Sequence, residues 1–374
     1  FDVTYARNYT DVDDKIIAKS KETGIPADKY AAMMIKRIDK VMREFDVDDP
    51  DIWLKATCNI DNIIDFIKGL EEKGYAYATP EGDVYFSVEK FPSYGALSNR
   101  KTEEAFSGVR IENEDNKKSA LDFALWKSAK EGEISWDSPW GKGRPGWHIE
   151  CSAMNRAAFG DQIDIHGGGR DLIFPHHENE IAQSEALTGK KFVKYWIHNG
   201  LIKVNGQKMS KSRGNVISPD TLIEKYGSDA FRLYLMFGFS YVEGGPWNDK
   251  GLESIQRFMD RVERLVCHSR TFSYNNNPLT AAEKNIEYVR NNTIKCVTAD
   301  TENFAFNTAI ARIMEFTNAL TDYENKVSDK NAVFKECVED LVKVLAPFAP
   351  HFTEELWEIL GNKTTIFNTE FPKV

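Results

Sequence analysis

Short apolar runs alternate with helical periodicity through the first half of the chain. Residues 2–6 are typical of a short buried strand, and residues 62–73 repeat apolar side chains at the spacing of a helix. A second periodic segment predicts a helix over 27–45, and the turn Pro80–Gly82 predicts a hairpin. The highly charged, aperiodic stretch 100–118 is typical of a surface loop.

Strands and helices alternate more regularly in the middle of the chain. The pattern predicts strands at 122–126, 162–166 and 193–198, with helices at 147–159 and 176–187. Alternation of this kind indicates a doubly wound parallel sheet, in which ligands bind beyond the carboxyl ends of the strands. We therefore expect an α/β fold with its functional residues at those strand ends.

The last third of the chain has a helical pattern throughout. Ser218 is typical of a helix cap ahead of Pro219, and every strong periodic segment that follows is a helix. The predicted helices are 219–226, 228–237, 250–266, 280–298, 305–323, 331–345 and 353–360. Because Gly244–Pro246 interrupts the periodicity, we place a domain boundary near 240–250 and expect an all-α helical bundle beyond it.

Composition limits the class of protein. A chain of 374 residues exceeds what one hydrophobic core organises, so two or three domains are expected. There is no apolar run of membrane-spanning length, and the start at Phe1 lacks the features of a secretory signal, which predicts a cytoplasmic protein. Five scattered cysteines suit reduced thiols. The net charge of −10 argues against non-specific coating of nucleic acid but leaves a local tRNA-binding face open.

Thiol, imidazole and carboxylate groups recur in the middle of the chain. His176 and Glu180 are four residues apart on a predicted helix and therefore share a face, and Cys151 lies on the preceding predicted helix. Such a mixed donor set suits zinc. Spacing alone leaves the alternative that Cys151 is a small buried hydrophobe and that the adjacent histidines cap a helix.

The string Lys208-Met-Ser-Lys-Ser212, called the lysine loop below, supplies two ammonium groups and two hydroxyls. Such groups can hold a triphosphate, which points to ATP chemistry. Lys208 and Lys211 are the candidate catalytic cations, with Ser210 and Ser212 as candidate ATP-binding hydroxyls. The alternative is a solvated loop.

Several strings around these residues resemble the signatures of class I cysteinyl-tRNA synthetases. They are Tyr5–Ile17, Tyr94–Arg100, Ser135–Trp140, Arg144–Met154 and Phe174–Ser184, and the resemblance covers about residues 1–212. It implies a Rossmann-like catalytic domain that activates L-cysteine with ATP and Mg²⁺ and transfers the cysteinyl group to tRNA. Adenylate formation of this kind needs no protein nucleophile.

The resemblance also implies roles for matched residues. In this family a zinc ion held by two cysteines, a histidine and a glutamate takes the substrate thiolate as a further ligand, and the matched ligands are Cys151, His176 and Glu180. Zinc stabilises a thiolate but binds a serine hydroxyl poorly, so a separate editing site is unnecessary. The residues that the resemblance places in or beside the amino-acid pocket are Trp147, His166 and Thr10, with Asp164 and Gly167–Gly169 shaping its backbone and Gly168 serving ATP. Core packing is the alternative for Trp147.

Two elements of the family are missing from the sequence. The His-Ile-Gly-His signature does not occur, and neither does the first zinc-binding cysteine, because no other cysteine has the matching context. We expect both elements to precede Phe1. The alternative is a non-catalytic, RNA-binding paralogue that cannot activate an amino acid.

Beyond the lysine loop the chain resembles a second family. Arg213–Arg232, Phe306–Leu320 and Leu345–Trp357 are similar to leucyl-tRNA synthetases. An engineered fusion, a natural recombinant and an unusual cysteinyl enzyme all stay open, as does a cysteine–amine ligase. We expect a monomer whose partner is cysteine tRNA, with leucine tRNA as the alternative.

These resemblances define the expected domains. They are a catalytic domain at 1–203 with a connective insertion at about 25–120, the lysine loop and stem-contact helices at 204–245, and an anticodon-binding helical bundle at 246–374. In the bundle, Arg257, Arg261 and Arg264 share a helix face, which suits phosphate contacts and a plain solvated surface equally. Phe306, Ile310 and Ile313 are expected in the core.

Overall fold

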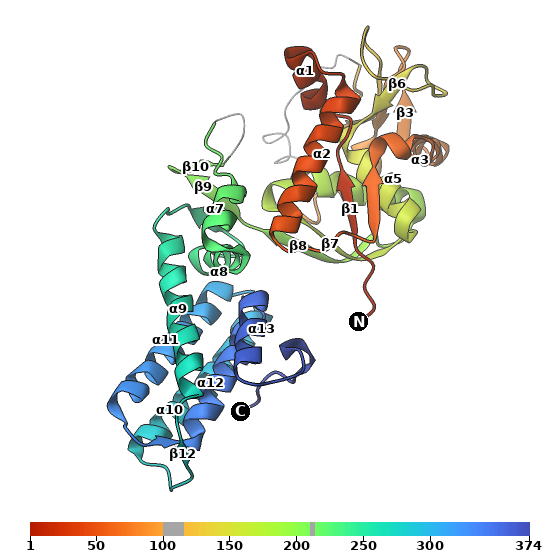
Figure 1. Cartoon of the computed structure of the whole chain (residues 1–374). Coiled ribbons are helices and arrows are strands. Elements are labelled where there is room, and N and C mark those ends of the chain that lie inside the picture. The colour runs from red at the N-terminus through yellow and green to blue at the C-terminus, as the bar shows by residue number, and fades with distance from the viewer. Residues whose placement is uncertain (100–115, 210–213) are drawn as a thin grey trace. The chain divides into compact units, whose positions relative to one another are not determined.

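Two compact units make up the chain. The computed structural model describes residues 1–99, 116–209 and 214–374 (Figure 1). Unit 1 comprises residues 1–43 and 47–198, and unit 2 comprises residues 44–46 and 199–374. Within the described residues, no helix combines the length and the apolarity needed to cross a lipid bilayer.

Unit 1 begins with a pair of parallel strands joined by two helices. Strand β1 (Ala6–Tyr9) pairs with β2 (Ile52–Lys55), and α1 (Asp14–Thr23) and α2 (Ala27–Glu44) connect them. The Asp13 carboxylate caps α1 by accepting a hydrogen bond from Lys15 N at 2.8 Å. A strand is present at this end of the chain, but it lies at Ala6–Tyr9 and not at residues 2–6, because residues 2–5 are exposed and lack a partner strand within the described residues.

A second pair of strands carries most of the candidate chemistry. Strand β7 (Ile163–Gly169) pairs with β8 (Val193–Asn199), and α6 (Glu178–Thr188) links them. Ile163 N donates to Phe192 O at the start of both strands, and a Cβ at Gly167 would lie 3.6 Å from Ile197 O. Positions therefore advance together along the two strands, which makes them parallel, as the pattern predicts.

An antiparallel sheet forms the rest of unit 1. Its order is β3 (Ala76–Ala78), β4 (Val84–Phe86), β5 (Phe123–Ser128) and β6 (Gly143–Pro145), and it confirms the predicted hairpin. The prediction that 122–126 belongs to the parallel sheet is wrong, because these residues lie in β5. Apolar patterning shows that Leu125 and Trp126 are covered, but it does not show which strand is their neighbour.

Two helices close the core of unit 1. Helix α3 (Ile60–Glu72) buries Ile63, Phe66 and Leu70 in the cluster that contains Trp126, and α5 (Trp147–Phe159) packs against α3 and α6. The short helical turns are η1 (Ala56–Cys58), η2 (Val88–Lys90), η3 (Arg170–Leu172) and the π-helical η4 (Ile173–His177). The core thus fixes α5 and α6, which supply the candidate ligands.

Unit 2 begins with a small three-stranded sheet that the sequence pattern does not predict. Its order is β10 (Gln207–Lys208), β9 (Leu201–Val204) and β11 (Gly244–Pro246). Gly244 has a φ of 69°, and a Cβ there would overlap the backbone of Leu201. The glycine that interrupts the helical periodicity therefore permits a close strand pairing.

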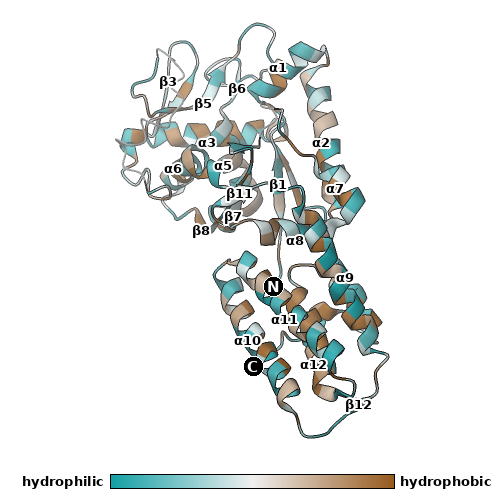
Figure 2. Cartoon of the chain, turned by 90° about the vertical axis from the view of Figure 1, so that its left-hand side faces the viewer, coloured by the Kyte–Doolittle hydropathy of each residue, from teal (hydrophilic) through white to brown (hydrophobic). Residues whose placement is uncertain are grey.

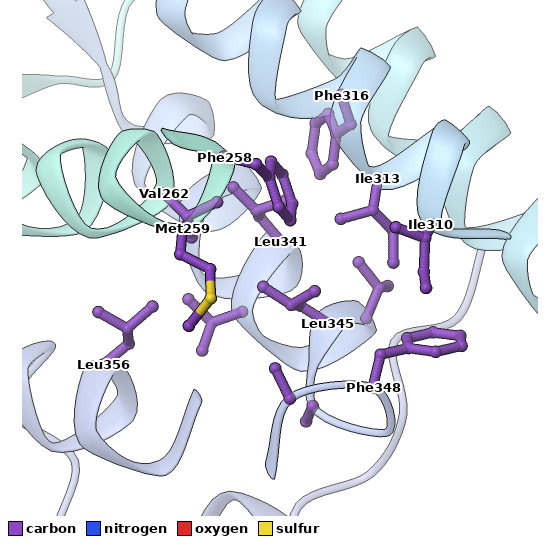
Figure 3. Close-up of a cluster of buried hydrophobic side chains, with 14 of the residues drawn as sticks. Phe258, Met259, Val262, Ile310, Ile313, Phe316, Leu341, Leu345, Phe348 and Leu356 are labelled. Carbon is purple, nitrogen blue, oxygen red and sulfur yellow. The ribbon is translucent and has the colours of Figure 1, made fainter. Parts of the chain in front are cut away.

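Seven helices in the described part of unit 2 confirm the predicted helical pattern. They are α7 (Pro219–Tyr226), α8 (Ser228–Gly238), α9 (Gly251–Ser269), α10 (Ala281–Glu302), α11 (Phe306–Lys326), α12 (Ala332–Leu345) and α13 (Pro350–Ile359), with η6 (Ile366–Asn368) and the short pair β12 (Tyr274–Asn275) and β13 (Lys330–Asn331). Hydrophilic and hydrophobic residues alternate along them (Figure 2). Ile310 and Ile313 are fully buried beside Phe316 and Leu341 (Figure 3), and Phe306 packs against the same core.

Candidate metal centre

Helices α5 and α6 bring the three predicted metal ligands together. Cys151 lies in α5, His176 in the π-helical turn ahead of α6, and Glu180 in the first turn of α6. Their ligand atoms all lie within 4.8 Å of one another, and all three residues are buried. A Cys–His–Glu set at this separation can enclose one cation of the size and softness of zinc.

A buried amide ties the two helices together beside these ligands. The Gln183 side chain donates from Nε2 to Ser152 Oγ at 2.8 Å and to His148 O at 3.0 Å. Gln183 belongs to α6, whereas Ser152 and His148 belong to α5. Because the amide makes both bonds in the interior, it fixes how far Cys151 stands from the residues of α6.

The Glu180 carboxylate sits among imidazoles. His176 Nε2 lies 3.0 Å from Glu180 Oε1, and His166 Nε2 lies 3.1 Å from Oε2. Burial alone would raise the pKa of Glu180, but His166 and His176 outweigh it and hold that pKa below its ordinary value. Both carboxylate oxygens are buried and neither has an aligned hydrogen bond within the described residues. A cation would satisfy oxygens left in this state.

Three histidines that the sequence reasoning did not single out extend the centre. His148 Nδ1 lies 2.9 Å from His176 Nδ1, and His177 Nδ1 lies 2.7 Å from His198 Nε2. Burial lowers the pKa of His148 to about 3 and that of His177 to about 3, so both rings are neutral at neutral pH. When His176 donates from Nδ1 to His148, its Nε2 lone pair is available to a metal.

Two donor sets share Glu180. Besides the predicted ligands, His166, His177 and Glu180 form a second group whose ligand atoms lie within 4.8 Å of one another. His166 thus lies beside the carboxylate, and its predicted place in an amino-acid pocket stays a prediction. The tandem His176–His177 was the available signal, since both rings approach Glu180 Oε1, at 3.0 and 4.0 Å.

The Cys151 thiol is held in a state that favours neutrality in the absence of a cation. Burial raises the pKa of Cys151 well above its ordinary value, and the charge of Glu180 adds to this effect. Asn8 donates from Nδ2 to Cys151 Sγ at 3.5 Å, which connects β1 with α5. Thr10 lies two residues beyond Asn8, just after β1, and is exposed.

Trp147 lies over one of the candidate ligands. Its ring stacks on His176 with centroids 4.3 Å apart, and the residue is 44% exposed. The alternative of core packing therefore does not describe Trp147. The backbone of Gly168 approaches His177 closely, because a Cβ there would lie 2.8 Å from His177 Cε1. Asp164, by contrast, forms an exposed ion pair with Lys194 at 2.6 Å.

The lysine loop is only partly within the described residues. Lys208 is exposed in β10 of unit 2, and Asn215, which lies beyond the loop, donates from Nδ2 to Lys208 O at 3.3 Å. Ser210, Lys211 and Ser212 lie outside the described residues. The proposed phosphate contacts of this loop stay predictions.

Comparisons with known proteins match both parts of the chain. Residues 1–257 match the family described as tRNA synthetases class I (C) catalytic domain, and residues 283–374 match the anticodon-binding domain of tRNA ligase. A cysteine–tRNA ligase of Syntrophotalea carbinolica is 55% identical over 236 residues, which are 63% of this chain and 49% of that protein. The chain spans about half the length of the first curated relatives it matches.

Two further matches extend beyond the catalytic part. A cysteine–tRNA ligase of Anoxybacillus flavithermus is 42% identical over 369 residues, which are 96% of this chain and 75% of that protein. A crystal structure of a LeuRS–tRNA–LeuAMS ternary complex from Agrobacterium radiobacter matches with a TM-score of 0.52 and 26% identity, over 67% of this chain and 35% of that one. One cysteinyl relative thus spans nearly the whole chain, including the part that resembles leucyl enzymes.

Proposed function

Since the chain belongs to the cysteine–tRNA ligase family of class I tRNA synthetases, we propose that its protein activates L-cysteine with ATP and transfers the cysteinyl group to tRNA. The observation that carries this proposal is the buried set of Cys151, His176 and Glu180. A thiol-selective enzyme needs a group that distinguishes sulfur from oxygen, and these three side chains are the donors that zinc prefers. The family likewise implies zinc, together with ATP and Mg²⁺.

The residues of the centre divide the work of holding a cation. Cys151, His176 and Glu180 would be its ligands, and bound zinc would supply a positive charge that stabilises the substrate thiolate. His148 fixes the His176 tautomer, and His166 lies against the second carboxylate oxygen of Glu180. Trp147, stacked on His176 and partly exposed, would exclude water from one side of the proposed amino-acid site.

The lysine loop would act on the nucleotide. Lys208 and Lys211 would neutralise the phosphates of ATP, with Ser210 and Ser212 donating hydrogen bonds, as pyrophosphate leaves. The substrate carboxylate is itself the nucleophile, so the chain needs to position and neutralise charge rather than form a covalent bond. Gly168 and Thr10 are proposed at the nucleotide and amino-acid sites respectively.

The anticodon-binding family match at residues 283–374 favours tRNA over a small amine as the acceptor. A ligase that joins cysteine to a small amine has no use for such a domain. We therefore propose cysteine tRNA as the partner. The domains proposed for these steps are 1–203 for activation, 204–245 for the lysine loop and 246–374 for the anticodon.

Metal content and amino-acid choice test the function together. In the full-length protein, Cys151→Ala is expected to lose bound zinc by elemental analysis and to reduce cysteine-dependent pyrophosphate exchange by more than a hundredfold. Cys337→Ala, at a buried cysteine of the bundle, is the matched control and should keep both. Wild-type protein that holds no zinc, or that activates serine as readily as cysteine, would contradict the proposal.

A further inference from the structure

The exposed side of helix α10 carries no carboxylate between positions 284 and 295. Its exposed residues between positions 284 and 295 are Lys284, Asn285, Tyr288, Asn292 and Lys295, and we call them the α10 stripe. Spacings of three, four and seven residues place them on one side of the helix. The opposite side carries Ile286, Ile294 and Val297, which are buried in the bundle core. The stripe is thus the solvent-facing part of α10 between positions 284 and 295, and the exposed Glu302 follows seven residues after Lys295.

The members of the stripe have few internal contacts. Tyr288 is 69% exposed, more than any other aromatic residue in the described part of unit 2, and it has no hydrogen-bond or ring partner there. Lys284 and Lys295 form no ion pair with any described residue. By comparison, Lys326 on α11 pairs with Asp322 at 2.9 Å. Because the Tyr288 ring and the two lysine ammonium groups contact little of the bundle, they contribute little to its stability.

The charge of the stripe also differs from that of its protein. The chain carries 58 acidic and 48 basic residues, yet every charged side chain exposed on α10 between 284 and 295 is a lysine. The nearest acid in sequence, Glu287, is half-buried on the flank. A local cationic face on an acidic protein attracts a polyanion.

We infer that the α10 stripe binds the anticodon arm of the tRNA, with Tyr288 stacking on an unpaired base and the two lysines contacting phosphates. The inference rests on the proposed function, and α10 lies almost wholly in the part that matches the anticodon-binding family. Aromatic rings stack on bases of single-stranded RNA, and asparagines beside the ring can hydrogen-bond to base edges. Lysines supply the salt-dependent part of the affinity.

Direct binding of cysteine tRNA to the full-length protein tests the stripe. Tyr288→Ala is expected to raise the Kd for tRNA by about tenfold. Tyr288→Phe, which keeps the ring, should leave the Kd within about twofold of the wild-type value. The double variant Lys284→Ala/Lys295→Ala should reduce the slope of log Kd against log salt by about one to two. The controls are Phe367→Ala, a ring 57% exposed elsewhere in unit 2, and Lys326→Ala.

The outcomes separate this inference from the proposed function. Unchanged tRNA affinity in Tyr288→Ala, in protein whose wild type charges cysteine tRNA, would overturn the stripe alone. A wild type that charges no tRNA with cysteine would overturn the proposed function. If analytical ultracentrifugation showed a changed oligomeric mass for Tyr288→Ala while its tRNA affinity was unchanged, the stripe would be a protein interface. That result would also overturn the inference. Weaker binding with cysteine-dependent pyrophosphate exchange intact would support it.

Discussion

The metal centre of unit 1 and the apolar core of unit 2 are both buried, but the centre consists of ionisable side chains whereas the core consists of apolar ones. Glu180 and Phe316 are both fully buried. The core gains free energy because apolar surface leaves water, whereas burial of a carboxylate costs free energy that its neighbours must offset. The side chains of His166 and His176, 3.1 and 3.0 Å from the carboxylate oxygens, reduce that cost around Glu180. The comparison suggests that side-chain volume decides which residues fit the core, whereas the ability to bind a metal decides which residues fit the centre.

The largest expected effect is a loss of volume in the core. Phe316→Ala should lower the free energy of unfolding by about 4 kcal/mol, because it removes a buried ring and leaves a cavity. Urea unfolding followed by circular dichroism measures it. The exposed Phe367→Ala should change stability by less than about 0.5 kcal/mol. Equal effects of the two substitutions would remove the distinction between core and surface.

The metal should stabilise unit 1 and leave the bundle core unaffected. Zinc at a free concentration of a hundred times its Kd is expected to add about 2.7 kcal/mol to the unit that binds it. Amide hydrogen exchange of the full-length protein, with zinc and with a chelator, should show slower exchange in α5 and α6 only. Cys151→Ala should abolish the difference. Equal protection of α11 and α12 by zinc would show that the two regions are not independent.

A single added methyl group should disturb the centre more than its size suggests. At Gly168 a Cβ would lie 2.8 Å from His177 Cε1 and 3.0 Å from Leu172 Cδ1, so Gly168→Ala is expected to cost about 2 kcal/mol by overpacking. Gly167→Ala is the matched control, because its Cβ would meet only Ile197 O at 3.6 Å. Thermal unfolding and zinc titration measure the pair. Identical behaviour of both variants would show that the histidines adapt freely.

The smallest expected effect is the pH-dependent contribution of the Glu283 helix cap to the stability of unit 2. Glu283 accepts from Thr280 N at 2.9 Å and from Tyr323 OH at 2.7 Å. Burial opposes ionisation, but these bonds outweigh it and lower the pKa of Glu283. A lowered pKa adds stability above the unfolded-state value near 4.5, and this stability is lost as the pH falls through the folded-state pKa.

Glu283→Gln should therefore cost about 1 kcal/mol at pH 7 and progressively less as the pH falls below 4. Urea midpoints at several pH values measure this. Glu302→Gln, an exposed change near the end of the same helix, should be nearly neutral at every pH. A loss that grows towards low pH would reverse the sign that the bonds to Thr280 and Tyr323 require.

The two regions also differ in how far the sequence predicts them. The predicted helix at 280–298 is observed as Ala281–Glu302, because long amphipathic periodicity is a local signal. In the centre, the spacing of His176 and Glu180 predicted their shared face. Donor chemistry offered Cys151 of the preceding helix as a third ligand but left a buried hydrophobe as the alternative, and the family resemblance favoured the ligand. His148 and His198 were missed because their partners lie 28 and 21 residues away in sequence. Pairing across such distances is set by tertiary packing.

Short strands escaped prediction for a related reason. β9, β10 and β11 contain only two to four residues each, so none is long enough to show a period. Gly244–Pro246 was interpreted as an interruption, although its backbone pairs with Leu201–Lys203. Likewise, alternation of strand and helix correctly predicted β7 and β8 but could not separate the parallel pair from the antiparallel sheet that contains β5.

The close pairing of β11 with β9 leaves no space for a side chain at two glycine positions. Side chains at either Gly200 or Gly244 would collide with the backbone of the facing segment, so neither partner can change first and be rescued by the other. In a saturation library of this chain, both positions should accept glycine alone, while the exposed neighbour Glu243 should vary widely. Glycine is therefore expected at both positions together, although they lie far apart in the sequence.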